Sequence, residues 1–280
     1  VSLYNTMNAD SGVARFKKDM DVLLKCYHPV SLQDLLVCIK QGQMPARNSF
    51  MLTFDDGLTE CHGVVAPILK EKGIPAVFFL CSAFVDNKEW AYDCKKALLA
   101  NELASRRWSG ADAGKVHEVL EEVGLGGSHL GPSLLLVDYS RRGVLDKIAS
   151  LIEYDFESYL RTERPYLTSD QVFELLKGGH AVGAHSIDHP RYSDLTLAEQ
   201  RRQTRASLAF VKERFHLDCG AFSFPHSDAH ISKVFFEDIL SAGEVDVLFG
   251  NQGFLKDSVS RSLQRSSMEK TSMSAEGILG

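Results

Sequence analysis

The chain has 280 residues, a formal net charge of −6 at pH 7, and 44% hydrophobic and 24% charged residues. The length suits one large α/β domain or two small ones, and the composition supplies enough apolar material for a sizeable core. The acidic balance provides no basic field, so we expect no nucleic-acid partner.

The cysteines and the apolar runs exclude two further classes of protein. None of the six cysteines forms a C-x-x-C pair, and most lie in apolar segments, so buried free thiols are favoured over a disulfide framework. The first eighteen residues contain no apolar run typical of a secretory signal. The longest apolar run, Ile74 to Val85, is shorter than the ~20 residues that span a bilayer. We therefore expect a soluble chain without a membrane span, in the cytoplasm or cell envelope of a bacterium, and of open oligomeric state.

The first part of the chain predicts a βαβ unit preceded by helices. Apolar residues recur with helical spacing, Ser31 is a favourable N-cap, and Gly42 and Gly73 end helices. A strand, a helix of about a dozen residues and a second strand imply parallel pairing. The predicted helices are 11–27, 31–40 and 59–72, and the predicted strands are 49–54 and 76–80.

Residues 88–163 interrupt this alternation. They predict helices with polar faces at 89–103, 113–123 and 142–160, with a weak strand candidate at 134–137. We interpret the segment as a helical insertion in one catalytic domain that spans residues 1–280. A lid and simple packing are both open roles for it.

The alternation resumes at Thr168, where Thr168 and Gln171 form the pattern of a capping box. Five or more strands that alternate with helices favour an α/β fold with a parallel sheet, either open or closed into a barrel. Helices are predicted at 168–178, 196–215 and 231–242, and strands at 180–184, 221–224 and 245–249.

Polar side chains follow two of the predicted strands. Asp55 and Asp56 end the strand at 49–54, and His185 and His189 follow the strand at 180–184. Parallel sheets place ligands at the carboxyl ends of their strands, so the two clusters are expected to meet. Two imidazoles and one carboxylate are typical of a catalytic divalent-metal site, and a second carboxylate would serve as a base.

These clusters resemble the first two motifs of the polysaccharide deacetylases, carbohydrate esterase family 4, which contain the NodB-homology domain. The motifs are Thr53-Phe-Asp-Asp-Gly57 and His185-Ser-Ile-Asp-His189. The similarity covers most of residues 11–85 and 165–228 and leaves the insertion out.

The resemblance implies a distorted (β/α) barrel of about seven parallel strands and removal of acetyl groups from N-acetylated sugars. It implies that Asp55 is the general base, and that Asp56, His185 and His189 hold a divalent metal. Zn²⁺ suits two imidazoles and a carboxylate, and Co²⁺ or Ni²⁺ would fit the same ligands.

The third and last motifs of the family differ in this chain. Ser223 stands where the family commonly has an arginine that orients the base, and His226 stands where it has a tyrosine. The backbone N–H of His226 is a candidate oxyanion donor. His226 and His230 are also spaced as a second metal site would require, although a pocket-lining or surface role for His230 is favoured.

The general acid is the least determined role. The family usually supplies a histidine near the C-terminus, whereas Arg265-Ser-Ser-Met-Glu269 resembles a variant ending with arginine. As a catalytic residue, Arg265 would stabilise charge or tune an acid, but it does not readily donate a proton at neutral pH, so His226 is the candidate acid. Three functions remain in view: a carbohydrate deacetylase, a hydrolase of a sugar ester or non-sugar amide, and a catalytically silent glycan-binding protein.

Overall fold

The computed structural model describes residues 9–105, 108–127, 129–253 and 259–268, together with residues 275 and 277. The chain forms two compact units. Val1–Asp86 and Pro165–Gly280 form the first, and Asn87–Arg164 form the second. In the described part of the chain, no helix is both long and apolar enough to cross a bilayer.

Six parallel strands form the main sheet of the first unit, in the order β3-β4-β5-β6-β7-β8. Their order in the sheet is their order in the chain, as in a barrel that is wound in one direction. The α/β barrel predicted from the sequence is confirmed as a curled half-barrel. The strands are β3 (Leu52–Phe54), β4 (Ala76–Leu80), β5 (Ala181–Ala184), β6 (Ala221–Ser223), β7 (Val247–Gly250) and β8 (Ser262–Gln264).

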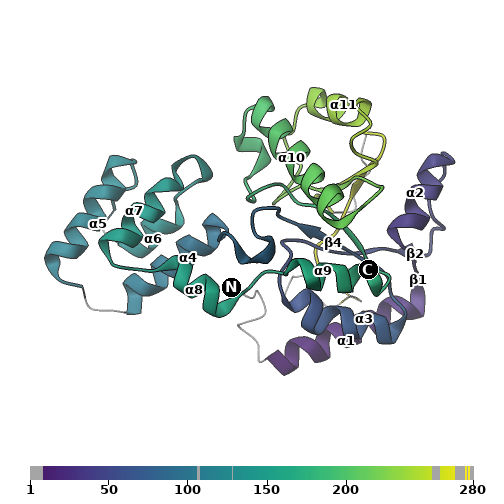
Figure 1. Ribbon diagram of the computed structural model, residues 1–280, viewed down its shortest axis with the longest axis horizontal. Helices are drawn as coiled ribbons and strands as arrows, with labels where there is room; N and C mark the ends of the chain where they lie inside the picture. The colour runs from purple at the N-terminus through teal and green to yellow at the C-terminus, as the bar shows by residue number, and fades with distance from the viewer. Residues whose placement is uncertain are drawn as a thin grey trace. The chain divides into compact units, whose positions relative to one another are not determined.

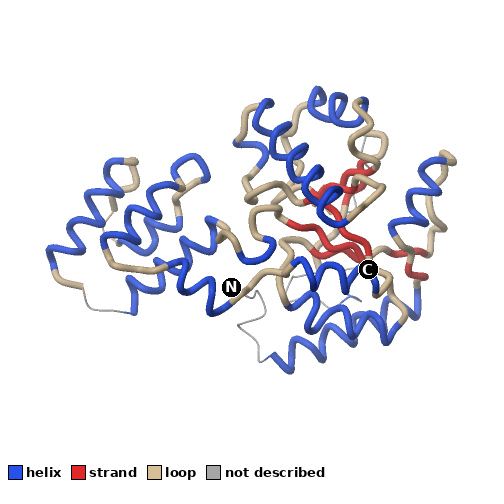
Figure 2. Tube along the Cα trace, in the orientation of Figure 1, coloured by secondary structure: helices blue, strands red, loops and turns tan. Residues whose placement is uncertain are grey.

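Helices cover both sides of the strands in the view of Figure 1, and Figure 2 shows the strands in red between them. Three of these helices begin at a residue whose side chain accepts a hydrogen bond from a backbone N–H of the first turn. Thr168 caps α9 in the predicted capping box, and Thr196 and Ser232 cap α10 and α11. These helices are α1 (Ala9–Cys26), α3 (Ala66–Lys72), α9 (Ser169–Lys177), α10 (Leu197–Phe215) and α11 (Lys233–Ser241).

Alternate residues of β4 enter two different hydrophobic clusters, because successive side chains of a strand point to opposite faces. Phe78 and Leu80 belong to the large cluster beneath the surrounding helices. Val77 and Phe79 pack instead with Ala221, Val247 and Phe249 and with three leucines of α2 (Leu32–Lys40). Helix α2 therefore fills the inner face of the curled sheet, and the polar site lies on that face at the carboxyl ends of the strands.

The predicted strand at 49–54 is two strands in the structure. Residues Ser49–Phe50 form β2, which pairs with β1 (His28–Pro29) in a separate parallel sheet, and β3 follows at Leu52. Strand β8 was not predicted, because its sequence Ser-Leu-Gln has neither an apolar run nor β-branched residues. A short π-helical turn, η1 (Cys61–Val65), precedes α3 within the predicted helix at 59–72.

The second unit contains only helices among its described residues. The predicted strand at 134–137 is wrong, because Leu134 lies in a helix, and the predicted helix at 142–160 is divided in two. Asp155 caps the second of these two helices. The helices are α4 (Tyr92–Ser105), α5 (Gly110–Glu122), α6 (Leu130–Leu135), α7 (Gly143–Leu151) and α8 (Phe156–Glu163).

Candidate metal centre and active site

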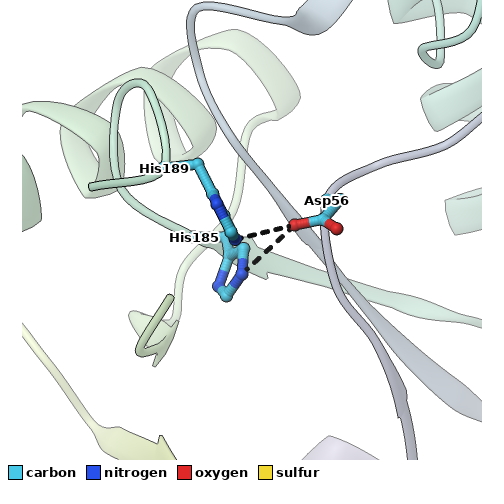
Figure 3. A group of neighbouring side chains, drawn as sticks. All are labelled: Asp56, His185 and His189. Carbon is cyan, nitrogen blue, oxygen red and sulfur yellow. Dashed lines mark ion pairs between the residues drawn. The ribbon is translucent and has the colours of Figure 1, made fainter. Parts of the chain in front are cut away.

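Asp56, His185 and His189 converge on one point at the carboxyl end of the sheet (Figure 3). Asp56 follows β3, and both histidines follow β5. The Nε2 atoms of His189 and His185 lie 3.1 Å and 3.4 Å from Oδ1 of Asp56. The side chain of His185 is 1% exposed, whereas those of His189 and Asp56 are 15% and 40% exposed, so solvent reaches the group from the side of Asp56 and His189.

The hydrogen bonds of this group favour a bound cation. Nδ1 of His185 lies 2.8 Å from the carbonyl oxygen of Ser223, which can only accept, so Nδ1 carries the proton. In the neutral imidazole, Nε2 then turns a lone pair toward the carboxylate of Asp56. Oδ1 of Asp56 is buried and accepts no hydrogen bond from the described protein atoms. Lone pairs that face one another without a proton repel, and a divalent ion between them removes that repulsion.

The charge state of Asp56 agrees with a ligand role. Burial on its own raises the pKa of this carboxyl, but the charges of His189 and His185 in their protonated form, and the hydrogen bonds that this form donates, outweigh burial and hold the pKa well below its usual value. Asp56 is therefore ionised over the whole neutral range, as a metal ligand must be. The donor set of two imidazole nitrogens and one carboxylate oxygen fits a divalent metal of the zinc type.

Asp55 forms a bidentate ion pair with Arg265, which follows the strand at the opposite edge of the sheet. Nη1 and Nη2 of Arg265 donate to the two carboxylate oxygens of Asp55, each at 2.8 Å. The same nitrogens donate to Oγ1 of Thr53 at 2.9 Å and to Oγ of Ser223 at 2.7 Å. Nε donates to the carbonyl oxygen of Gly250 at 3.1 Å. All five N–H donors of the guanidinium are thus used, which fixes the plane of the Asp55 carboxylate.

The bidentate pair also keeps Asp55 ionised. Burial raises the pKa of Asp55, while the charges of His185 and Arg265 and the hydrogen bonds from Arg265 lower it, and the net effect is a pKa below the usual value. Ser223 fills the space beside this pair and donates to the carboxylate at 3.2 Å and 3.3 Å. The arginine that the third motif lacks is therefore supplied by the segment after β8.

Arg265 also closes the open side of the half-barrel. Strands β3 and β8 are the two edges of the main sheet, and among the described residues no backbone ladder joins them. Thr53 belongs to β3 and Arg265 follows β8, so their hydrogen bond and the Asp55 pair span this seam. The guanidinium lies over the ring of Phe79 at 5.7 Å from its centroid, which supports it from the inner face.

A second set of hydrogen bonds holds the strand that carries Arg265. Nε2 of Gln264 donates to Oδ2 of Asp228 at 2.6 Å, and the backbone N–H of Asn251 donates to Oδ1 at 3.2 Å. Asp228 is buried and belongs to the loop after β6. This contact requires glycine at position 250, because a Cβ there would lie 2.4 Å from Oε1 of Gln264 and 2.5 Å from Asp228.

Several residues around the site have left-handed backbone conformations. Asp56 has φ 70°, Ser186 has φ 70°, His189 has φ 63° and His226 has φ 58°. A non-glycine residue in this region costs about 1–3 kcal/mol, and such residues cluster at functional sites. The spacing of the two histidines in sequence gives no sign of this geometry, because it depends on the loop being held from outside.

His226 lies next to the metal group, whereas His230 does not. The ring centroid of His226 is 4.5 Å from that of His189. His230 is exposed, and within the described ranges no group of three ligand-type side chains includes it. Asp55, Asp56, His185, His189, His226 and Arg265 are thus brought to one end of the sheet, and Ser223, Thr53 and Gly250 are the contacts that sequence reasoning missed. Glu269 lies outside the described residues.

Comparison with known proteins supports the resemblance from two directions. A family model described as polysaccharide deacetylase matches residues 42–129. YxkH of Bacillus subtilis (strain 168), whose name assigns it to the polysaccharide deacetylases only provisionally, is 24% identical over 93 residues. That match spans 31% of this chain and 33% of YxkH, so the chain covers about a third of that relative.

Solved structures show the same fold over nearly the whole chain. The Streptococcus pyogenes deacetylase PplD, solved in complex with acetate, matches with a TM-score of 0.60 and 14% identity, over 98% of this chain and 91% of PplD. IcaB from Ammonifex degensii matches with a TM-score of 0.53 and 16% identity, over 96% of this chain and 89% of IcaB. A de-N-acetylase from Aggregatibacter actinomycetemcomitans matches with a TM-score of 0.55 and 14% identity, over 94% of this chain and 86% of that protein. The resemblance to the polysaccharide deacetylases is confirmed.

Proposed function

We propose that this chain, which carries the fold and sequence motifs of the polysaccharide deacetylases, is a metal-dependent hydrolase. It would remove acetyl groups from N-acetylated sugars of a polysaccharide or glycan precursor. The observation that carries the proposal is the convergence of Asp56, His185 and His189 beside an aspartate that an arginine holds by two hydrogen bonds. A metal-ligand set next to an ionised base is the equipment that amide hydrolysis needs.

Asp56, His185 and His189 would hold the ion, and Zn²⁺ suits this set best, with Co²⁺ or Ni²⁺ as alternatives. When bound, a divalent ion supplies a Lewis acid that polarises the acetyl carbonyl and lowers the pKa of water. The buried imidazole of His185 is aligned by the carbonyl of Ser223, which keeps its Nε2 available as a ligand atom.

The residues of the chain would then perform the proton transfers. Asp55 takes a proton from the attacking water, since its carboxylate is ionised and lies 3.8 Å from Nε2 of His185 at the metal group. Arg265 keeps the carboxylate aligned and does not act as the acid. As the carbon–nitrogen bond breaks, the departing amine takes a proton from a general acid, for which we propose His226. The products are acetate and a free amino sugar.

The paired Asp55 argues against a glycan-binding protein that has lost catalysis. Ser223 in place of the third-motif arginine is the change that would favour such a loss, but Arg265 restores the missing contact. Retention of a base, its anchor and three ligand-type side chains favours an enzyme over a silent binder. The fold of PplD, whose structure holds acetate, is in keeping with an acetyl substrate.

The test combines metal analysis with acetate release. Purified protein should contain, or bind on addition, about one divalent ion per chain, measured by mass spectrometry of the metal and by calorimetry. The loaded protein should release acetate from N-acetylated oligosaccharides, and Asp55→Asn should abolish release while leaving the ion bound. A protein that binds no divalent ion would refute the mechanism.

The substrate panel separates the remaining alternatives. Faster acetate release from O-acetylated sugars, or faster ring opening of cyclic amides, than acetate release from N-acetyl sugars would assign the chain to the second function. Tight glycan and metal binding without turnover of any acetylated compound would assign it to the third.

A further inference from the structure

A buried glutamine on α10 lies behind the loop that carries both histidines. The side chain of Gln203 is fully buried, at 0% exposure. Its Oε1 accepts a hydrogen bond from the backbone N–H of Ile187 at 2.8 Å. Its Nε2 donates to Oδ1 of Asp188 at 2.7 Å and to Oε1 of Glu199 at 3.2 Å. Ile187 and Asp188 are in the segment between His185 and His189.

The loop is also held by the segment that follows β4, where the backbone N–H groups of Ser82 and Ala83 donate to the carbonyl oxygens of Ser186 and Ile187 at 3.1 Å and 2.9 Å. The loop lies outside the helices and strands, and both Ser186 and His189 have left-handed backbone conformations. Within the loop, the backbone N–H of His189 donates to Oγ of Ser186 at 3.0 Å. Strained backbone persists only where surrounding groups determine it. Gln203 of α10 adds side-chain contacts to Ile187 and Asp188, the two residues at the centre of this loop.

The amide of Gln203 offers an acceptor oxygen and a donor nitrogen, and its neighbours need both. A backbone N–H needs an acceptor, and the carboxylates of Asp188 and Glu199 need donors, which one amide side chain supplies together. Glutamate at this position would place a third carboxylate against those two. Methionine has a similar length and would leave all three groups without this partner. Amide geometry, and not volume alone, is therefore what position 203 requires.

We propose that Gln203 is a positioning residue that sets the metal affinity of the site by holding the loop between His185 and His189. The inference rests on the proposed function, since it requires a bound divalent ion. Groups that orient metal ligands typically change metal affinity by roughly 10- to 100-fold when they are removed. Gln203 touches neither ligand side chain in the contacts described above and acts through the backbone and Asp188.

Gln200 offers a matched control on the same helix. Its side chain is also buried, and its Nε2 donates to the carbonyl oxygens of Tyr192 at 2.7 Å and of Leu195 at 3.4 Å. Both contacts lie after the histidine loop. Gln200→Met and Gln203→Met therefore remove the same buried amide from one helix, at points that differ in whether the loop depends on them.

The experiment measures the dissociation constant for Zn²⁺ by chelator competition, with thermal unfolding of the metal-free proteins in parallel. We expect Gln203→Met to weaken Zn²⁺ binding roughly 10- to 100-fold, and Gln200→Met to change it by less than about 3-fold at a similar loss of stability. Equal Zn²⁺ affinity in the two variants overturns the inference. A wild-type protein that binds no Zn²⁺ instead refutes the proposed function itself.

If Gln203→Met does not fold, a pair of variants that exchanges the amide and carboxylate groups of Gln203 and Asp188 tests the positioning role instead. Gln203→Glu should weaken Zn²⁺ binding, because its carboxylate faces Asp188 and Glu199. Adding Asp188→Asn returns an amide donor to the pair from the other side, so the double variant should recover most of the lost affinity. A double variant no better than Gln203→Glu alone would contradict a positioning role.

Discussion

At the scale of single residues, the proposed base depends on a side chain from the far end of the chain. All five N–H donors of Arg265 form hydrogen bonds, with acceptors on Asp55, Thr53, Ser223 and Gly250. Such a pair gives orientation as well as charge, since the guanidinium and carboxylate planes must coincide. Lysine could keep the charge but not the plane.

Replacement of Arg265 should therefore alter both rate and pH dependence. We expect Arg265→Gln to lower kcat/KM by roughly 10- to 100-fold, as for other groups that orient a reacting residue, and Arg265→Lys to recover only part of the loss. Arg265 lowers the pKa of Asp55, so its removal raises that pKa. The proposed mechanism needs the ionised carboxylate, so the acid limb of the pH profile should move to higher pH.

Arg261 provides the control for this profile. Its Nη1 and Nη2 donate to the carbonyl oxygens of Val245 and Leu240, away from Asp55. Arg261→Gln should lower stability without moving the acid limb. An acid limb that stays in place in Arg265→Gln would show that Arg265 does not tune the base.

The role of His226 as general acid can be tested with substrates whose leaving groups differ in their need for a proton. An amine must be protonated as it departs, whereas a nitrophenolate leaves without help. His226→Gln should therefore lose most of its activity on N-acetylated oligosaccharides and keep most of it on nitrophenyl acetate. Equal losses on both substrates would exclude His226 as the acid.

Sequence patterns located most of the site but not its connections. Asp56, His185 and His189 were predicted because each follows a recognisable strand, and parallel strands end together. The partner of Asp55 was not predicted, because Ser223 shows only that one motif lacks its arginine. That Arg265 replaces it depends on how far the sheet curls, and no local pattern encodes the distance between β3 and β8.

At the scale of elements, β8 shows how a short strand escapes sequence reasoning and still matters. It contains only Ser262–Gln264 and pairs with β7 from Leu248 to Gly250. Gly250 accepts hydrogen bonds from both the backbone N–H and Nε of Arg265, and its missing side chain leaves room for Asp228 to reach Gln264. The positions of β8 and Arg265 are thus coupled through one glycine.

Gly250→Ala should disturb this coupling. Its Cβ would lie far inside contact distance of Gln264 and Asp228, and overpacking of this kind costs about 1–3 kcal/mol. We expect a lower melting temperature and a loss of deacetylase activity like that of Arg265→Gln. Gly63→Ala is the control, since a Cβ there meets nothing within 4 Å. Full activity of Gly250→Ala would show that β8 tolerates displacement.

At the scale of the whole molecule, hydrogen bonds within the first unit join the two points at which its chain is interrupted by the helical unit. The backbone N–H of Asp86 donates to the carbonyl oxygen of Leu167 at 3.0 Å. The carboxylate of Asp86 accepts from the backbone N–H of Ser169, at 2.6 Å, and from its Oγ, at 2.8 Å. Asp86 and Leu167 flank the points where the helical unit, Asn87–Arg164, leaves and rejoins the chain.

The helical unit should therefore be removable. Replacing residues 87–164 with a short Gly-Ser linker should leave a folded protein, because the ends are already adjacent and closing a short loop costs little entropy. We expect cooperative thermal unfolding and Zn²⁺ affinity within a few-fold of the full chain. A protein that is unfolded after excision would support the alternative that residues 1–280 form one inseparable domain.

The class of fold was predictable because strands and helices alternate with clear end signals such as the capping box at Thr168. The number of strands in the main sheet was not, since β8 contains neither an apolar run nor a β-branched residue that would mark it as a strand. In the helical unit, Leu134–Val137 has the composition of a strand but takes part in a helix and its C-terminal turn, which shows that tertiary packing overrides local preference.

The arginine that spans the seam also has a meaning for biosynthesis. Asp55 and Arg265 are separated by 210 positions, and a nascent chain grows from its N-terminus. The proposed metal ligands leave the ribosome before Arg265, and so do Gln203 and Ser223, which hold the histidine loop and the ring of His185. A nascent chain arrested between these points could load its ion while its base remains loosely held. Hydrolysis would then begin only when the final strand has docked, so catalytic competence would report completion of the barrel.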